Sequence, residues 1–428
     1  MLFDKAPETP QGRFFVGFDL RDDYCQISYM ENPGRRPPKE PATFSLLPGQ
    51  EKFDIPTAIA KAARVNHWSC GLDAQRAAAD GSSTYIPKLL SLALEGQLVR
   101  IEDSEYEPTA LLALFVNRCL ALISTVVPTS EISAIMFTAR QMNEKMIGIL
   151  ENVKQRLNLA CDVFYEGYAN SFYNFLLMQA DTVREPGSIL CEYTKDGPLR
   201  ISKMRYNLRV RPHVAYREEQ VIPGLYSEDA DGRDSEFLKI ITDAIGRDRF
   251  SSVYLIGNGF DGKWMKRSIL FLCKGRRAFI GNNLYSKGAG YGAYCKICNP
   301  EIAQDYYFLD SNRLKANIGI RGLQKGSTVL HSILDAGVNW YEAAAEDDVI
   351  LEDGNEVHLT LTPLTGGQSK DFLIRLDGLP MREGRTTRIR MHFSMSAPDK
   401  VKLFLEDMGF GEIFPSSGLR WEQTITID

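Results

Sequence analysis

The stretch "FVGFDLRDDYCQISYM", residues 15–30, decides how the rest of the chain is interpreted. The apolar segments on either side of a short charged segment predict a strand, a tight turn and a return strand. Asp19 stands near the end of the first strand, and Arg21, Asp22 and Asp23 make the turn. A turn that holds a phosphate is usually rich in glycine, because bare backbone amides can then face the anion. The interpretation of the whole chain therefore depends on whether this is a phosphate-binding hairpin or an ordinary one.

At 428 residues, the chain is long enough for two or more domains. Its formal charge of −5 argues against a broad nucleic-acid footprint, which needs a dominant basic face. The first residues are polar and contain Pro7 and Pro10, and the apolar stretch 110–127 is interrupted by Asn117 and Arg118. Eight scattered cysteines are typical of free thiols in a reducing compartment. We therefore expect a cytoplasmic protein that binds neither nucleic acid nor membrane.

Up to about residue 310, predicted strands and helices alternate, which indicates an α/β fold. An apolar helix is expected at 108–125 and a buried strand at 131–139, with a capping box at Thr138–Gln141 that begins the next helix. A second hairpin is expected at 188–212, around a turn at Asp196-Gly197. The segment 251–260 predicts a buried strand that ends in a glycine-containing turn.

From about Val357 the pattern changes to five successive strand candidates with period-two alternation, which predicts an antiparallel β-domain. The candidates are "EVHLTLTPL" (356–364), "DFLIRLDGL" (371–379), "TTRIRMHFSM" (386–395), "KVKLFLEDM" (400–408) and "LRWEQTITI" (419–427). We place the domain boundary after residue 310, within the hinge segment 303–314, which gives domains at 1–310 and 311–428.

Taken in order, these segments resemble the actin-like ATPase superfamily, and most closely the seventy-kilodalton heat-shock chaperones. "FFVGFDLRDDYCQISYM" and "SILCEYTKDGPLRISKM" stand where that family has its two phosphate hairpins. "VYLIGNGF" is similar to the family's adenosine loop, while "EGYAN" and "NNLYSKGAGYGA" are similar to its two small-residue connections. The resemblance implies a two-lobed nucleotide-binding-type domain at 1–310.

The rest of the chain extends the resemblance. "YYFLDSNRLKANIGIRG" (306–322) resembles the chaperones' interdomain linker and first β-strand, and the final strands resemble their peptide-binding β-sandwich. The resemblance implies a β-sandwich domain at 311–428. Because the sequence stops at Asp428, directly after the fifth strand, we expect no helical lid over that domain.

The two phosphate hairpins depart from the family pattern. Asp19 is kept, but Arg21 and Asp22 replace the family's glycine and threonine; in the second hairpin, Cys191 or Glu192 stands at the aspartate position. Extra carboxylates also oppose a polyphosphate, at about 3–4 kcal/mol for each charge pair some 4–5 Å apart at an effective dielectric of about 20. If the site is active, Asp19 and Glu192 are the expected catalytic acids.

The remaining site predictions follow from the resemblance. Gly257, Asn258 and Gly259, together with Asp19, are the expected nucleotide-binding residues, although glycines that merely end a strand are an equal alternative. The family's hinge packing falls on the small residues Gly167, Ala169, Gly288 and Gly292, with a flexible glycine-rich loop as the alternative to the last two. No metal site is expected, since the lone Cys295–Cys298 pair has no second pair of ligands nearby.

Three functional hypotheses follow. The first is a chaperone-like protein whose nucleotide site has degenerated and which binds a protein or peptide partner as a scaffold, with no cofactor required. The second is an active, divergent ATPase that uses ATP or ADP with magnesium. The third is an actin-like assembly or cell-division protein. The sequence favours the first, and therefore a protein that is not an enzyme, but it leaves the partner and the oligomeric state open.

Overall fold

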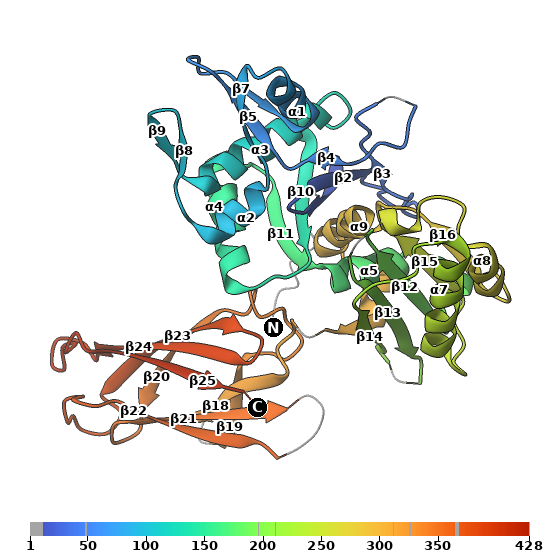
Figure 1. Ribbon diagram of the computed structural model, residues 1–428. Helices are drawn as coiled ribbons and strands as arrows, with labels where there is room; N and C mark the ends of the chain where they lie inside the picture. Colours follow the sequence, from blue (N-terminus) through green and yellow to red (C-terminus); the bar gives the residue numbers. More distant parts are fainter. Residues whose placement is uncertain are drawn as a thin grey trace. The chain divides into compact units, whose positions relative to one another are not determined.

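The computed structural model describes residues 12–47, 49–195, 197–209, 211–310, 312–324, 327–363 and 368–427. The chain divides into two compact units, Met1–Phe308 and Leu309–Asp428. Unit 1 is mixed α/β and unit 2 consists of antiparallel sheets, which confirms the predicted combination at this level (Figure 1). Three residues named in the predictions, Asp196, Ser311 and Leu364, lie outside the described residues, as do 1–11 and Asp428.

The first sheet of unit 1 is built around the opening hairpin. Its strand order is β11-β10-β1-β2-β3, and β4 also pairs with β2. β1, β10 and β11 are parallel, whereas β2 runs antiparallel to β1. The elements are β1 (Phe14–Leu20), β2 (Tyr24–Glu31), β3 (Ala42–Thr43), β4 (Ile55–Pro56), β5 (Ile59–Ala62), β6 (Trp68–Cys70), α1 (Gly71–Ala79), β7 (Ser83–Ile86), α2 (Leu89–Glu95), β8 (Val99–Ile101), β9 (Ser104–Tyr106), α3 (Pro108–Ile123), β10 (Ile132–Ala139), α4 (Glu144–Leu157) and β11 (Asp162–Gly167).

The second sheet repeats the strand order of the first. Its order is β16-β15-β12-β13-β14, with β17 added beside β14. β12, β15 and β16 are parallel, and β13 is antiparallel to both of its hairpin partners. The elements are α5 (Tyr168–Leu177), α6 (Asp181–Arg184), β12 (Gly187–Tyr193), β13 (Leu199–Asn207), β14 (His213–Ile222), α7 (Ala230–Ile245), β15 (Ser252–Ile256), α8 (Lys266–Leu272), β16 (Arg277–Ile280), α9 (Leu284–Cys298), α10 (Glu301–Asp305) and β17 (Tyr306–Leu309).

Helices α5 and α9 share one hydrophobic core with both sheets. Buried side chains of β1 and β10, such as Phe15 and Met136, belong to the same cluster as Leu190 of β12 and Tyr254 of β15. Residues of α5 and α9 complete this cluster, and α9 packs directly on β1. The two sheets are therefore joined through a continuous apolar core.

The helix after β10 begins later than its sequence pattern predicts. The capping box expected at Thr138–Gln141 is wrong, because Thr138 still belongs to β10. Asn143 is the N-cap instead: its side-chain oxygen accepts a hydrogen bond from the backbone N–H of Met146 at 2.9 Å. The Thr138 hydroxyl is thereby free to turn toward α5, where it lies 2.7 Å from the Ser171 hydroxyl.

Unit 2 contains two four-stranded antiparallel sheets, with orders β19-β18-β21-β22 and β20-β23-β24-β25. The five predicted strands are confirmed as β21–β25, and three further strands precede them. The bounds are β18 (Ala316–Gln324), β19 (Ser327–Leu334), β20 (Ala345–Leu351), β21 (Glu356–Pro363), β22 (Lys370–Arg375), β23 (Thr387–Ala397), β24 (Lys400–Gly409) and β25 (Arg420–Thr426). The alternation is clearest in β24, where buried and half-buried residues follow one another along its length.

No helix in the described ranges combines the length and the apolar character needed to cross a membrane. The long apolar helix α3 is 16 residues long and begins with Pro108. A proline is tolerated at this position because the first N–H groups of a helix have no partner within the helix.

Candidate functional site

The candidate site begins at the end of β1, where Asp19 is completely buried. Arg21 folds back from the turn so that its Nε and one Nη lie 2.9 Å from Asp19 Oδ2. The side chain of Asp22 does not join Arg21 at Asp19. Its carboxylate accepts a hydrogen bond from the backbone N–H of Ser91, in the first turn of α2, at 2.9 Å. The expectation that the turn carboxylates repel a phosphate is therefore wrong for Asp22, because a cation and not an acid points inward.

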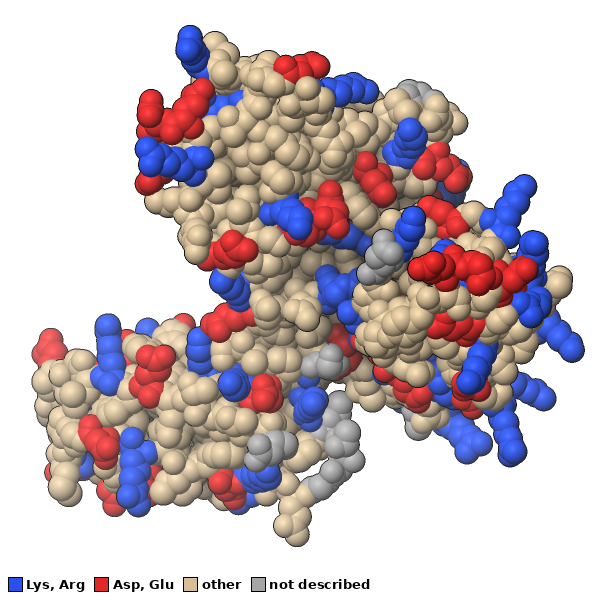
Figure 2. Space-filling view, viewed as in Figure 1, with Lys and Arg blue, Asp and Glu red and all other residues tan. Residues whose placement is uncertain are grey.

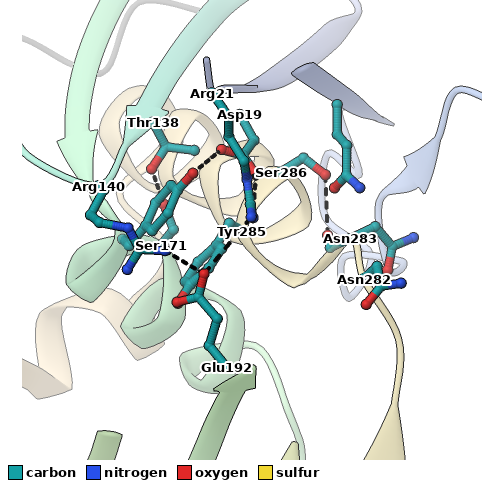
Figure 3. A network of polar contacts seen from close by, with 12 residues as sticks. Asp19, Arg21, Thr138, Arg140, Ser171, Glu192, Asn282, Asn283, Tyr285 and Ser286 are labelled. Carbon is teal, nitrogen blue, oxygen red and sulfur yellow. Dashed lines mark hydrogen bonds and ion pairs between the residues drawn. The ribbon is translucent and has the colours of Figure 1, made fainter. Parts of the chain in front are cut away.

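A second buried carboxylate, Glu192, lies at the end of β12 in the second sheet and is 5 % exposed. Arg140, which follows β10, forms an ion pair with Glu192 Oε1. Arg21 Nη1 lies 3.8 Å from the same oxygen, and the Tyr285 hydroxyl donates to Oε2 at 3.2 Å. Figure 3 shows these side chains converging from both sheets and from the start of α9. Arg21 thus stands between the two acids and contacts both.

Two stacked tyrosines complete a polar network with Asp19, Arg21, Arg140 and Glu192. Tyr168, the first residue of α5, donates its hydroxyl proton to Asp19 Oδ1 at 2.6 Å. Its ring stacks on that of Tyr285, with centroids 3.9 Å apart and planes 10° apart. The guanidinium groups of Arg21 and Arg140 lie 5.2 and 5.1 Å from the centre of the Tyr168 ring, within the range of a cation–π attraction.

The electrostatics of this network keep Arg21 charged. Burial alone would lower the pKa of Arg21, but the neighbouring Asp19 and tyrosines raise that pKa well above its ordinary value. Burial raises the pKa of Asp19, and Arg21 and Tyr168 offset part of that effect. Burial also raises the pKa of Tyr168 and of Tyr285 well above 10, so both rings remain neutral hydrogen-bond donors.

The residues at these two strand ends do not fit a phosphate or its magnesium ion. Each acid already has an arginine and a tyrosine as partners, so a metal ion would have to displace a charged guanidinium from a buried carboxylate. Among the described residues, no group of three or more His, Cys, Asp and Glu side chains is placed to hold a metal ion.

The predicted hinge residues lie in, or directly before, the same two helices as the stacked tyrosines. The helix α9 includes Gly288 and Gly292, so this segment is not a flexible loop. A Cβ on Gly288 would lie 2.0 Å from the backbone oxygen of Ser171 in α5, and one on Gly292 would lie 2.7 Å from Glu166 Oε2. Real Cβ atoms do not approach so closely, which gives a steric reason for glycine at both positions.

The other two hinge predictions fall on α5 itself. Gly167 ends β11 and is the N-cap of α5, and Ala169 is 7 % exposed in its first turn. Glu166, near the end of β11, accepts hydrogen bonds from Ser171 Oγ and from Asn174 Nδ2, each at 2.7 Å. The structure therefore brings Gly167, Ala169, Gly288 and Gly292 to the α5–α9 region.

The glycine loop after β15 has a reason that involves no ligand. A Cβ on Gly257 would lie 2.2 Å from the backbone oxygen of Tyr193, and one on Gly259 would lie 2.3 Å from the Tyr193 ring. Asn258 accepts a hydrogen bond from Lys195 N at 2.8 Å. The loop lines a cavity of about 670 Å³ together with residues 223–228, but Asp19 is not among the residues that line this cavity. Gly257 is not among them either, and the assignment of these four residues to a nucleotide stays a prediction.

Three residues of the network are absent from the sequence-based predictions: Arg140, Tyr168 and Tyr285. Arg140 could be found from the parallel pairing of β1 and β10, which places Thr138 opposite Asp19 and Arg140 just beyond it. Tyr168 is the first residue of α5, and Tyr285 is the second residue of α9. Because those helices are distant in sequence, only their packing brings the two rings together.

The chain belongs to a family of unknown function, DUF5716, whose C-terminal part matches residues 40–311. Residues 313–427 match a domain of unknown function, DUF8552. The two matches meet close to the division between the two compact units. No functionally curated protein matches the sequence.

Proposed function

We propose that this protein is a chaperone-like scaffold with an actin-like fold, whose nucleotide site is closed by its own side chains, and that it acts by binding protein partners. The observation that carries the proposal is the position of Arg21 between Asp19 and Glu192. The protein's own guanidinium takes the place that a metal-bound polyphosphate would need. The proposed activity therefore requires neither ATP nor ADP.

The repeated sheet supports the actin-like part of the proposal. The two six-stranded sheets of unit 1 share the same strand order over five strands and the same mixture of parallel and antiparallel pairs. In each, a buried acid stands at the end of the central strand, Asp19 in β1 and Glu192 in β12. Two lobes of like topology with acidic residues at corresponding turns are what the resemblance to actin-like ATPases implies.

The chemistry of the network argues against ATP hydrolysis. An ATPase needs cationic groups or backbone amides that are available to phosphate oxygens, and carboxylates that are available to magnesium or water. Here both carboxylates are in ion pairs and both arginines contact them. Releasing these groups would leave charges without partners in a buried site, which is costly.

Unit 2 supports the partner-binding part of the proposal. Met381 and Ile413, in the connections after β22 and β24, are 103 % and 84 % exposed, and Phe410 is 44 % exposed. Arg382 holds both connections in place, because it bonds Asp407 through two nitrogens at 2.8 and 2.7 Å and Pro415 O at 2.9 Å. Exposed apolar side chains on a fixed backbone are typical of surfaces that contact other proteins.

Calorimetric titration of the whole chain with ATP and ADP, with and without magnesium, tests the proposal. We expect no heat of binding and no rise in melting temperature, whereas a ligand at a hundredfold excess over its Kd would stabilise the fold by about 2.7 kcal/mol. One-to-one binding that is lost in the Asp19→Asn variant, accompanied by ATP hydrolysis, would favour the active ATPase. Binding that persists in this variant would place the nucleotide away from Asp19 and would contradict the expectation that the chain binds no nucleotide.

A further inference from the structure

The segment from Gly262 to Ile280, which contains α8 and β16, is a strongly basic stretch of unit 1. It carries six Lys and Arg residues and no Asp or Glu, although the whole chain has a formal charge of −5. Arg267 contacts Asp234, and Arg276 donates to backbone carbonyls of α8. Figure 2 shows Lys and Arg side chains projecting along the outer margin of the lobe that carries α8 in Figure 1.

Four of these cations have no carboxylate partner in the part of the chain that the structure describes: Lys263, Lys266, Lys274 and Arg277. All four are exposed. Charges that are neither neutralised nor needed for internal contacts create a positive field that attracts an anionic partner.

Apolar side chains are exposed among these cations. Leu270 on α8 is 74 % exposed, and Ile280 and Phe279 on β16 are 60 % and 39 % exposed. The Phe279 ring stacks on Tyr254 of the neighbouring strand at 4.9 Å, which fixes its position. A partner that covers this surface therefore gains from burying apolar groups as well as from charge pairing.

β16 is also an edge strand with unused backbone groups. Among the described residues, it is the last strand of its sheet and its one partner strand is β15, in parallel. Arg277 N donates to the carbonyl of Ser251, directly before β15, at 2.9 Å, and Gly281 N donates to the carbonyl of Leu255 in β15 at 3.1 Å. Since alternate residues of a strand face opposite edges, Ala278 and Ile280 direct their N–H and C=O groups to the free edge. Such an edge can accept one further strand.

We propose that β16 and α8 form a docking surface for an acidic, extended segment of another protein, which adds to the sheet beside β16 and places acidic side chains against the four cations. This inference rests on the proposed function, because it names a surface and a partner chemistry for the scaffold. A second copy of the same edge is disfavoured, since like charges would face each other. A lipid headgroup or a nucleic acid could pair with the cations but has no backbone for the free edge.

The test uses the whole protein and a fluorescein-labelled ten-residue peptide of alternating Glu and Val. We expect saturable binding by fluorescence anisotropy that weakens with added salt. The triple variant Lys266→Glu, Lys274→Glu, Arg277→Glu should weaken binding by about tenfold or more, since each lost charge pair contributes modestly. A matched control reverses three exposed cations elsewhere, Arg35→Glu, Arg36→Glu and Lys145→Glu, and should leave binding unchanged.

Two further arms separate strand addition from charge attraction. Ala278→Pro removes an N–H that faces only the free edge, so it should weaken binding by a comparable factor while the charges stay. A peptide that is N-methylated on alternate residues tests the same point without altering the protein. If either charge reversal or N-methylation leaves peptide binding unchanged, the inference is wrong.

Vesicles with phosphatidylserine and a single-stranded RNA of twenty nucleotides complete the comparison. Tighter binding of either through the same cations would overturn the inference in favour of that other class of partner. Because nucleotide titration does not involve this surface, a negative result here leaves the result on the closed nucleotide site unaffected, and the two proposals fail separately.

Discussion

The hairpins β1–β2 and β12–β13 occupy equivalent places in two sheets of the same strand order, yet their buried acids are neutralised differently. Asp19 is paired by Arg21, two residues along the same hairpin. Glu192 is paired by Arg140 and Tyr285, which come from outside its hairpin. The comparison shows that a buried acid at the same place in one framework can be paired with a cation in two ways: by an arginine inside its own turn, or by an arginine from a neighbouring element.

The largest effect is expected when the local partner is removed. Arg21→Ala leaves Asp19 buried without its cation, which should lower the free energy of unfolding by about 3–5 kcal/mol. Urea unfolding of the variant measures this. The double variant Asp19→Asn, Arg21→Ala should be less destabilised than Arg21→Ala, because no unpaired charge remains. A cost below about 1 kcal/mol for Arg21→Ala, as for an ordinary surface change, would contradict a buried pair.

The helix crossing that supports both hairpins gives the next effect. Gly288→Ala forces a Cβ against the Ser171 carbonyl and should cost about 3 kcal/mol through overpacking. Gly290→Ala on the same helix is the matched control, since its Cβ would meet nothing closer than Pro41 at 3.6 Å. It should be neutral or stabilising by up to about 1 kcal/mol, because alanine favours helix. If urea unfolding gives the same loss of unfolding free energy for Gly288→Ala and Gly290→Ala, the close contact between α9 at Gly288 and α5 at Ser171 is refuted.

The tyrosine hydroxyls should distinguish the two acids more finely. Tyr168→Phe removes a 2.6 Å bond to the buried Asp19 and should cost about 2 kcal/mol. Tyr285→Phe removes a longer bond of 3.2 Å to Glu192 and should cost about 1 kcal/mol. Both changes keep the ring stack, so thermal unfolding of the two variants compares the hydrogen bonds alone. The reverse order of effects would mean that Glu192 depends more on its tyrosine than Asp19 does.

The smallest effect is expected at Arg140. Its side chain is 41 % exposed, compared with 16 % for Arg21, so solvent screens its pair with Glu192. Arg140→Ala should therefore cost about 1 kcal/mol or less in urea unfolding, and higher salt should reduce the difference further. A loss as large as that of Arg21→Ala would show that the distant partner is as important as the local one.

The sequence was sufficient for the elements and for part of the site. Periodicity predicted β10, α3 and the strands β21–β25, because each element has one clear buried face or continuous apolar character. Asp19 and Gly288 were singled out because they lie within the segments that carry the resemblance, and the structure finds the first buried and the second at the α5–α9 contact. Asp22 was interpreted wrongly, since a turn sequence does not show which side chain points inward and which one caps a neighbouring helix.

The network itself could not be predicted, because its residues meet only in the folded chain. Tyr168 and Tyr285 are separated by α6, the whole second hairpin, α7 and α8, and nothing local indicates that their rings stack. Arg21 was visible but was interpreted only as the loss of a glycine. Its position two residues after Asp19 on the same hairpin is compatible with an ion pair, and that interpretation would have anticipated that Arg21 pairs with Asp19.

The most direct test of the closed site is a crystal structure of the whole chain grown with millimolar ATP and magnesium. We predict that Arg21 remains on Asp19 and Arg140 on Glu192, with no nucleotide between the two hairpins. A triphosphate held between Asp19 and Glu192, with Arg21 turned away from both acids, would contradict the account.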